Sequence, residues 1–265
     1  MHIICSSDAN EGGVQIWSQI KIEAIFTDYR IQSNANNQIT VTVSSEALSA
    51  ALRSAAAPAT GGGASEADTV MKLAKKNDQA VMTFEILSTS RAGKRVRIEH
   101  DVRIDIMRPE DVDKLQEPMC PEPDVHILLP SLTKLRTVVH RLQPMSKVLA
   151  VRANASGQLQ ISVSTDAVKV DVAWSGLANP PMGRDVAASQ EPEPPEEEEK
   201  DPTQLYGVLM KVTSFLKFLS SSSVSTTTIA CICQNHAMIL YVYIGEVADA
   251  GGVLTFYIPA IIDDG

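Results

Sequence analysis

Apolar and polar residues alternate along much of the chain, and this pattern predicts a protein built mainly from β-strands. In the run 95–106, Val96, Ile98 and Val102 fall on one face, and arginine, glutamate and aspartate fall on the other. Successive side chains of a strand point to opposite faces of a sheet, so this run predicts a strand with one apolar face. Similar alternation, or a short apolar run, predicts strands at 14–26, 39–43, 69–74, 80–87, 124–130, 159–163, 168–174, 204–211, 226–233, 237–244 and 253–259.

Three short segments depart from the alternation and follow the spacing of an amphipathic helix. In residues 131–143 the apolar positions recur at three- and four-residue intervals, which places them on one helical stripe: Leu132, Leu135, Val138, Val139 and Leu142. Pro130, directly before this segment, is tolerated in the first turn of a helix. Similar stripes predict helices that begin near Ser44 and near Val212.

Each predicted helix follows directly on an extended run and is followed by further strands, so one strand–helix pattern occurs three times. The helices do not alternate singly with strands, as they would in the crossovers of a parallel sheet. The pattern therefore predicts an α+β fold in which antiparallel sheets carry a few short helices on one face.

Two segments rich in proline and acids divide the chain. Residues 108–123 contain four prolines and several acids, which predicts an extended connector between an N-terminal domain, 1–107, and a C-terminal domain, 124–265. Residues 184–202 include Glu-Pro-Glu-Pro-Pro-Glu-Glu-Glu-Glu-Lys. Such a segment buries too little apolar surface to offset its ordering entropy, so we expect a disordered acidic insertion.

The predicted helix at 131–143 differs in charge from the rest of the chain. The formal net charge is −9, yet no aspartate or glutamate falls between Ser131 and Gln143. Lys134, Arg136, His140 and Arg141 all lie off the apolar stripe. An acidic protein with a helix whose polar face is only basic suggests an anionic partner. A plain solvated helix face is the alternative for any single lysine or arginine.

The sequence contains no recognisable catalytic or metal-binding constellation. Its four cysteines do not form the two Cys-x-x-Cys pairs of a zinc site, and Cys231-Ile-Cys233 is better explained as two core thiols of a protein in a reducing compartment. Gly61-Gly62-Gly63 lacks the Gly-Lys-Ser/Thr of a phosphate loop, and Gly-x-Ser-x-Gly is absent. We therefore predict no catalytic residue, no metal and no cofactor. The sequence also shows no signal peptide and no apolar run long enough to span a bilayer.

Several stretches resemble the DNA sliding-clamp family, and within it the Hus-one type of checkpoint-clamp subunit. The resemblance spans nearly the whole chain and lies in Gly12-Gly13-Val14 with Trp17, in 115–118 and 123–125, in Leu128 to Pro130, in 177–181 and in 256–260. It implies a non-enzymatic, two-domain subunit of a heterotrimeric ring that encircles DNA in the nucleus. Strands form the outside of such a ring, and short helices line its hole.

The resemblance also implies partners and sites. The partners would be Rad-nine-type and Rad-one-type subunits, a clamp loader, double-stranded DNA bound without sequence preference, and DNA repair and DNA damage checkpoint proteins. The residues expected to face DNA are Lys134, Arg136, His140, Arg141, Lys211, Lys217 and Arg53. The strands at 95–106 and 167–175 are expected to form the subunit edges, through Arg95, Arg97, Ile98, Arg103, Val168, Val170 and Val172. The alternative for these strands is an ordinary charged edge. The connector could border a peptide groove or be a plain linker.

The chain departs from the family pattern at its start. The family has four strand–helix units, whereas three are recognisable here, and the first unit of the first domain is not. A truncated sequence and a genuine short form would both explain this difference, and we favour truncation. A second hypothesis follows, in which the protein is a scaffold that binds the other clamp subunits without closing a ring on DNA.

Overall fold

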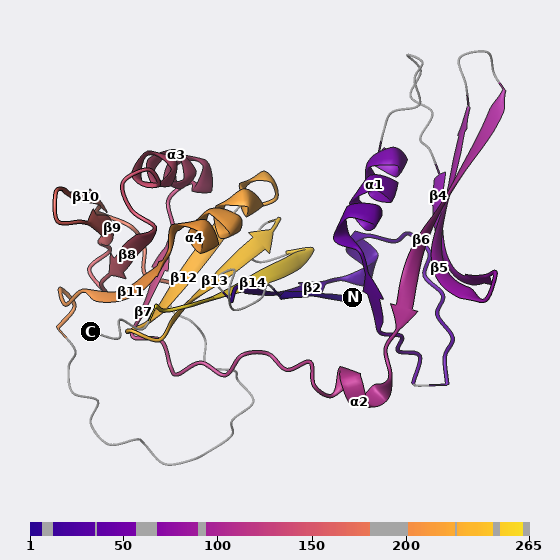
Figure 1. Cartoon of the computed structure of the whole chain (residues 1–265), viewed down its shortest axis with the longest axis horizontal. Coiled ribbons are helices and arrows are strands. Elements are labelled where there is room, and N and C mark those ends of the chain that lie inside the picture. Colours follow the sequence, from indigo (N-terminus) through magenta and orange to yellow (C-terminus); the bar gives the residue numbers. More distant parts are fainter. Residues whose placement is uncertain are drawn as a thin grey trace. The chain divides into compact units, whose positions relative to one another are not determined.

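The protein folds into two compact units of mainly antiparallel sheet. The computed structural model describes residues 1–6, 13–34, 36–56, 68–89, 94–180, 201–225, 227–245 and 250–261 (Figure 1). Unit 1 consists of Met1–Tyr29 together with Glu117–Gly265, and unit 2 consists of Arg30–Gln116. Every strand pair recorded in either unit is antiparallel, as predicted.

The described residues of unit 1 form two sheets. The six-stranded sheet has the order β1-β2-β14-β13-β12-β7, and the four-stranded sheet has the order β10-β9-β8-β11. The strands are β1 His2–Ser6, β2 Gln15–Ile20, β7 Val125–Leu128, β8 Val148–Ala153, β9 Leu159–Ser164, β10 Lys169–Trp174, β11 Tyr206–Lys211, β12 Thr227–Cys233, β13 Ala237–Ile244 and β14 Gly252–Pro259. The helices are η2 Ile22–Ala24, α3 Leu132–Leu142, α4 Val212–Leu219 and η3 Ser220–Ser223.

The two longer helices of unit 1 lie next to each other on one side of its sheets (Figure 1). Leu135 and Val139 of α3, and Phe215 and Phe218 of α4, are completely buried in the core of this unit. Side chains from both sheets enter the same core, among them Ile161 of β9. The apolar stripes read from the sequence therefore attach α3 and α4 to the sheets, and their polar faces turn away from the sheets.

A buried asparagine anchors the segments that flank the predicted acidic insertion. The side-chain amide of Asn154, which is only 1% exposed, donates to the carbonyl of Thr203 at 3.1 Å. The side-chain amide of Asn179 donates to the backbone carbonyls of Asn154, at 3.1 Å, and of His126, at 2.7 Å. Residues 184–200 of the predicted insertion lie outside the described residues.

Unit 2 is one four-stranded sheet with a helix on one face. The strand order is β3-β6-β5-β4, and α1 packs against β5 and β6 through Ala51, Phe84 and Val102. Its elements are β3 Val41–Val43, α1 Ser45–Ala56, β4 Asp68–Lys76, β5 Gln79–Thr89, β6 Arg95–Ile106 and α2 Pro109–Val112.

Several details differ from the sequence prediction, including β8, where no strand was predicted. The long strand predicted at 14–26 ends at Ile20, and the chain turns through η2 instead. The connector 108–123 contains one turn of helix, α2. Residues 1–29, predicted in the N-terminal domain, belong to unit 1 because β2 pairs with β14. Pairing between strands so far apart in sequence leaves no local signal.

Candidate nucleic-acid interface and open sheet edges

The polar face of α3 carries the basic residues singled out from the sequence. Pro130 and Ser131 precede the helix, and the carbonyl of Ser131 accepts hydrogen bonds from the amides of Lys134 and Leu135. Ser131 is the N-terminal cap by position, but its side chain makes no capping hydrogen bond. The first turn of α3 contains no acid, so its helix dipole is left uncompensated by any acidic side chain of its own.

The four candidate side chains of α3 form two pairs on either side of Thr137. At 100° per residue, Lys134 and Arg141 lie on one flank of the polar face, and Arg136 and His140 lie on the other. The side-chain Nε of Arg136 donates to Nε2 of His140 at 3.4 Å. All four residues are exposed, and the structure records no ion pair for them among the described residues. The helix therefore presents a basic surface rather than a neutralised one.

The other helices contribute less positive charge. Lys217 is exposed on the polar face of α4, beside Thr213 and Ser220, and Lys211 is half-buried at the N-terminal cap of that helix. The first turn of α4 also lacks acids. In unit 2, Arg53 is exposed on α1, but Glu46 shares that helix. Thus α3 and α4 bring together six of the seven candidates within unit 1, and Arg53 belongs to the other unit.

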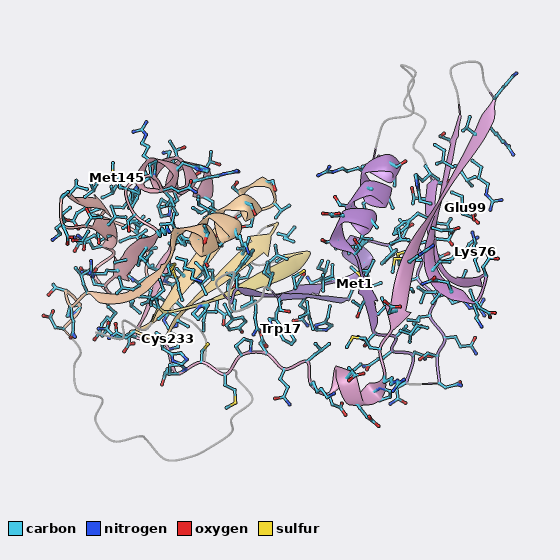
Figure 2. The ribbon with its side chains drawn as sticks, in the orientation of Figure 1. Met1, Trp17, Lys76, Glu99, Met145 and Cys233 are labelled. Atoms are coloured by element: carbon cyan, nitrogen blue, oxygen red, sulfur yellow. The ribbon has the colours of Figure 1, made fainter. Side chains whose placement is uncertain are left out.

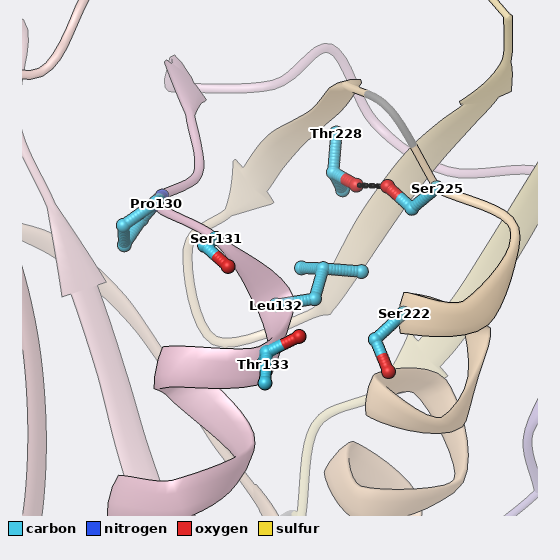
Figure 3. A pocket seen from close by; sticks show the side chains of 7 residues that line it. All are labelled: Pro130, Ser131, Leu132, Thr133, Ser222, Ser225 and Thr228. Atoms are coloured by element: carbon cyan, nitrogen blue, oxygen red, sulfur yellow. Dashed lines mark hydrogen bonds between the residues drawn. The ribbon is translucent and has the colours of Figure 1, made fainter.

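A small cavity lies where α3 begins (Figure 3). Its volume is about 180 Å³, and its lining is Pro130, Ser131, Leu132, Thr133, Ser222, Ser225 and Thr228. The hydroxyls of Ser225 and Thr228 lie 2.9 Å apart and form a hydrogen bond. The lining contains no charged side chain, histidine or cysteine, so its serine and threonine hydroxyls have no general base in the cavity to activate them.

One edge of β6 is open over residues 95–103 in the described structure. β5 pairs with these residues on one side, and β3 pairs on the other side only with 104–106. The amide of Met107 donates to the carbonyl of Thr40 at 3.0 Å, on the β3 side. Alternate residues of an antiparallel strand turn their amide and carbonyl toward the same neighbour. The groups at the open edge therefore belong to Arg95, Arg97, Glu99, Asp101 and Arg103.

The two faces of this edge differ in chemistry. Val102 packs against α1, so even-numbered residues of β6 face the helix and odd-numbered residues face away from it. On the helix side, Val96 and Ile98 are each still 39% exposed, so the apolar face predicted for 95–106 is only partly covered. Ile106, at the other end of the same face, is 65% exposed.

The opposite face of unit 2 carries a network of ion pairs. Arg97 contacts Glu85 at 2.7 Å and Glu99 at 3.2 Å, and Glu85 also contacts Lys72 at 3.2 Å. Lys76 pairs with Glu99 and with Asp101. Figure 2 labels Lys76 and Glu99 on this face. These hydrogen bonds to Lys76 lower the pKa of the Glu99 and Asp101 carboxyls. No ion pair is recorded for Arg95 or Arg103, the other predicted edge arginines, among the described residues.

The strand β10 is the second open edge. It pairs only with β9 in the part of the chain that the structure describes, at the end of its sheet. The amide of Thr165 donates to the carbonyl of Val168 at 2.9 Å, so even-numbered residues turn toward β9. The open edge then belongs to Lys169, Asp171 and Ala173. Val170 packs toward the core beneath α3 and α4, and Val168, just before the strand, is 40% exposed.

The face of the six-stranded sheet turned away from α3 and α4 is rich in aromatic side chains. Trp17, Tyr241, Tyr243 and Tyr257 surround the buried thiols of Cys231 and Cys233. Figure 2 labels Trp17 and Cys233 on this side. Burial raises the pKa of Cys231 to about 12 and of Cys233 to about 11, so both thiols stay protonated near neutral pH. Both cysteines are free, which agrees with their prediction as core residues.

The end of the connector crosses this aromatic face. The hydroxyl of Tyr257 donates to the Glu117 carboxylate at 2.6 Å. The Asp124 carboxylate accepts a hydrogen bond from the backbone amide of Gln234 at 2.8 Å. These contacts hold residues 117–124 against β12 and β14.

Two further classes of site find no support in the described residues. No group of three histidine, cysteine or acidic side chains is placed to hold a metal ion in that part of the chain. Among the described helices, none is both long and apolar enough to cross a membrane.

The fold is that of a sliding clamp. The chain is similar to the crystal structure of proliferating cellular nuclear antigen from Entamoeba histolytica, with a TM-score of 0.61 over 98% of this chain and 85% of that one, at 12% identity. The chain belongs to the Hus1-like protein family, whose model matches residues 1–262.

Its relatives are named as checkpoint proteins, which supports a clamp-type checkpoint role. Checkpoint protein hus1 of Schizosaccharomyces pombe is 34% identical over 94% of this chain and 84% of the relative. Checkpoint protein HUS1 of Homo sapiens is 28% identical over 98% of this chain and 85% of the relative. The resemblance read from the sequence is therefore confirmed, as is the fold class.

Sequence reasoning missed two features of these surfaces. Thr137 lies at the centre of the basic face, between the two pairs, and its hydroxyl donates to the carbonyl of Thr133 at 3.0 Å. Burial across the whole helix was needed to locate that centre. The aromatic face was also missed, although Tyr241-Val242-Tyr243 gives a signal, because two tyrosines two residues apart in a strand share a face.

Proposed function

We propose that this protein is a non-enzymatic subunit of a ring clamp that encircles DNA at damage sites and recruits checkpoint and repair factors in the nucleus. The observation that carries the proposal is the polar face of α3, which is basic on both flanks and free of acids in an acidic chain. Lysine and arginine on such a face contact phosphates without reading bases. Lys211, Lys217 and Arg53 are the supporting candidates on α4 and α1.

The two open edges support assembly into a ring with other clamp subunits. At both β6 and β10, the residues that point to the open edge carry their side chains on the face turned away from the helices. Because the chain is made of L-amino acids, the side of a strand to which a residue's amide points and the face on which its side chain lies together determine the direction in which the strand runs along that edge. Two such edges therefore make one continuous sheet, with all helices on the same side, only when they pair antiparallel. A closed ring with strands outside and helices inside requires that arrangement.

The partners in this proposal are the Rad-nine-type and Rad-one-type subunits, with a clamp loader that supplies the ATP chemistry. Each would meet a different edge of this subunit. Arg95, Arg97, Ile98 and Arg103 belong to one contact, and Val168, Val170 and Val172 to the other.

The first experiment measures the mass of the complex formed when the chain is mixed with those two subunits. A 1:1:1 complex is the expected result. After loading on nicked circular DNA, the complex should be retained on the circle and lost when the DNA is linearised, because a ring slides off a free end.

Two outcomes would count against the proposal. A complex that assembles but leaves circular and linear DNA equally would favour a protein-only scaffold. An affinity for short linear duplex DNA that is unchanged when Lys134, Arg136 and Arg141 are all replaced by glutamate would remove α3 from the DNA-facing surface.

A further inference from the structure

We propose that Cys120 and Cys233 form a disulfide when the protein is exposed to hydrogen peroxide, and that this bond fixes the connector against the aromatic face of unit 1. Cys120 belongs to the connector, and Cys233 is the last residue of β12. The inference goes beyond the proposed function and does not depend on it, because both residues belong to one compact unit of this chain.

The two thiols lie on the same side of the six-stranded sheet. Cys233 is completely buried in a cluster with Cys231 and Tyr257, and Cys120 packs against that cluster from the connector. The thiol of Cys233 donates to the backbone carbonyl of Pro121 at 3.4 Å. Pro121 directly follows Cys120, and successive Cα atoms are about 3.8 Å apart. Cys120 is therefore one residue away from a direct contact with the sulfur of Cys233. A negative charge on Cys120 also acts to raise the pKa of Cys233, as expected of near neighbours.

The connector around Cys120 can adjust enough to complete the bond. Residues 115–123 form neither a helix nor a strand. On one side of Cys120 the segment is held by the hydrogen bond from Tyr257 to Glu117, and on the other side by the backbone amide of Asp124, which donates to β12 at 2.8 Å. A disulfide needs its two Cα atoms about 4.4–6.8 Å apart. An extended segment with an anchor on each side can shift locally to meet this requirement and keep both anchors.

Cys233 is a better partner for Cys120 than either of the other two cysteines. Cys231 lies further along β12, opposite His126 of β7. Cys231 and Cys233 are also poorly placed for each other, because residues two apart on one strand have Cα atoms about 6.7 Å apart and parallel side chains. Cys5 lies on β1 and outside this cluster.

The peroxide accepts the electrons that the two thiols lose. Cys120 reacts first, because it is only partly buried. Its sulfur attacks one oxygen of the peroxide, so that the O–O bond breaks, an S–O bond forms, and the other oxygen leaves as water with the thiol proton. The sulfur of Cys233 then attacks the sulfenic sulfur of Cys120, which forms the S–S bond, breaks the S–O bond and releases a second water. Two thiols and one peroxide thus give one disulfide and two waters.

Burial makes this response slow. It raises the pKa of Cys120, and it raises the pKa of Cys233 to about 11, so thiolates are scarce near neutral pH. Brief contact with peroxide should leave both thiols intact, whereas sustained exposure should form the bond. The bond closes a long loop of the chain and replaces noncovalent anchors of the connector by a covalent one.

The first test maps disulfides in the full-length chain after sustained treatment with hydrogen peroxide. Mass spectrometry without reduction should find two peptides joined through Cys120 and Cys233, and dithiothreitol should separate them. Cys120→Ala and Cys233→Ala should each abolish this linked pair. Cys231→Ala is the matched control, because it removes a thiol from the same face of the same strand, and it should leave the linked pair in place. Near-UV circular dichroism before treatment checks that each variant is folded.

Hydrogen exchange tests whether the bond fixes the connector. The backbone amide of Asp124 donates to the carbonyl of Ile232, so it exchanges only when this end of the connector opens. Its exchange should slow at least about tenfold in the oxidised protein and recover after dithiothreitol. Cys120→Ala treated with peroxide should show no such slowing.

Three results would overturn the inference. They are peroxide treatment that oxidises Cys120 to sulfinic or sulfonic acid without linking it to Cys233, a link from Cys120 to another cysteine in the folded protein, and exchange at Asp124 that is unchanged by the disulfide. None of these results bears on the clamp role, because assembly with the other subunits and retention on DNA are measured without peroxide. Loss of ring assembly, in turn, would leave the linked pair in place.

Discussion

Neutralising Lys134, Arg136 and Arg141 by glutamine is a quantitative test of whether the polar face of α3 meets DNA. The logarithm of nonspecific DNA affinity falls with the logarithm of salt concentration by about 0.9 per phosphate contact in duplex DNA. Three contacts thus contribute a slope of about 2.7, which amounts to roughly 40-fold in affinity between 50 and 200 mM salt. The triple variant should lose that part of the salt dependence.

The position of the side chains sharpens this expectation. Lys134 and Arg141 lie on one flank of Thr137, and Arg136 lies on the other, bonded to His140. Duplex DNA lying across Thr137 would reach both flanks. Each single glutamine variant should then lower the slope by about 0.9. A slope that changes for one flank only would place the DNA to that side of the helix.

The assay is equilibrium binding of the assembled complex to short linear duplex DNA, whose free ends let a ring enter and leave, measured at several salt concentrations. Arg152→Gln is the matched control, because Arg152 lies on the sheet face opposite the helices, where it donates to Ser162 at 2.9 Å. It should leave the slope unchanged. An unchanged slope in the triple variant, or an equal change in the control, would refute the reasoning.

Three other predictions concern the fold and its titratable groups. Replacing Leu135, which is fully buried in α3, by alanine should lower the free energy of unfolding by about 2–5 kcal/mol. The exposed substitution Thr137→Ala should lower it by less than about 0.5 kcal/mol, and urea melts measure both changes. Burial lowers the pKa of His126 below 6.5, and the negative charge of Glu122 offsets part of this shift. The unfolded chain then binds the proton more tightly, so stability should fall as pH drops below 6.5, and less so in His126→Asn. Mass spectrometry after iodoacetamide treatment of the native protein should find Cys5, which is exposed, alkylated before Cys231.

The elements were predicted best where the apolar pattern is unbroken along the whole element. Helix α3 begins and ends within one residue of its predicted bounds, since its stripe is continuous and Pro130 precedes it. β6 matches its predicted bounds, Arg95–Ile106, because the alternation is unbroken. The prediction was wrong past Ile20, where Ile22 and Ala24 continue the alternation but the backbone forms η2. A short-range pattern cannot distinguish a strand from a helical turn over so few residues.

The candidate surfaces were predicted only in part. The charged surface of α3 can be predicted from the sequence, because successive side chains of a helix are separated by a known angle around its axis. The open sheet edges cannot be predicted in this way, since they depend on which strands pair and on where β3 ends. Sequence alternation places Arg97 and Ile98 on opposite faces, but only hydrogen bonds to distant strands show which of their amides is available to a neighbour.

The anchoring of Asn179 and Thr203 to Asn154 also bears on how this protein can be labelled. Because Asn179 and Thr203 both bond to Asn154, the residues on either side of the predicted insertion are held together. Lengthening the predicted insertion should then add little entropic cost, since the cost of closing a loop grows only with the logarithm of its length. A fluorescent protein or affinity tag spliced between residues 184 and 200 should accordingly leave α3, β6 and β10 available for every measurement described above.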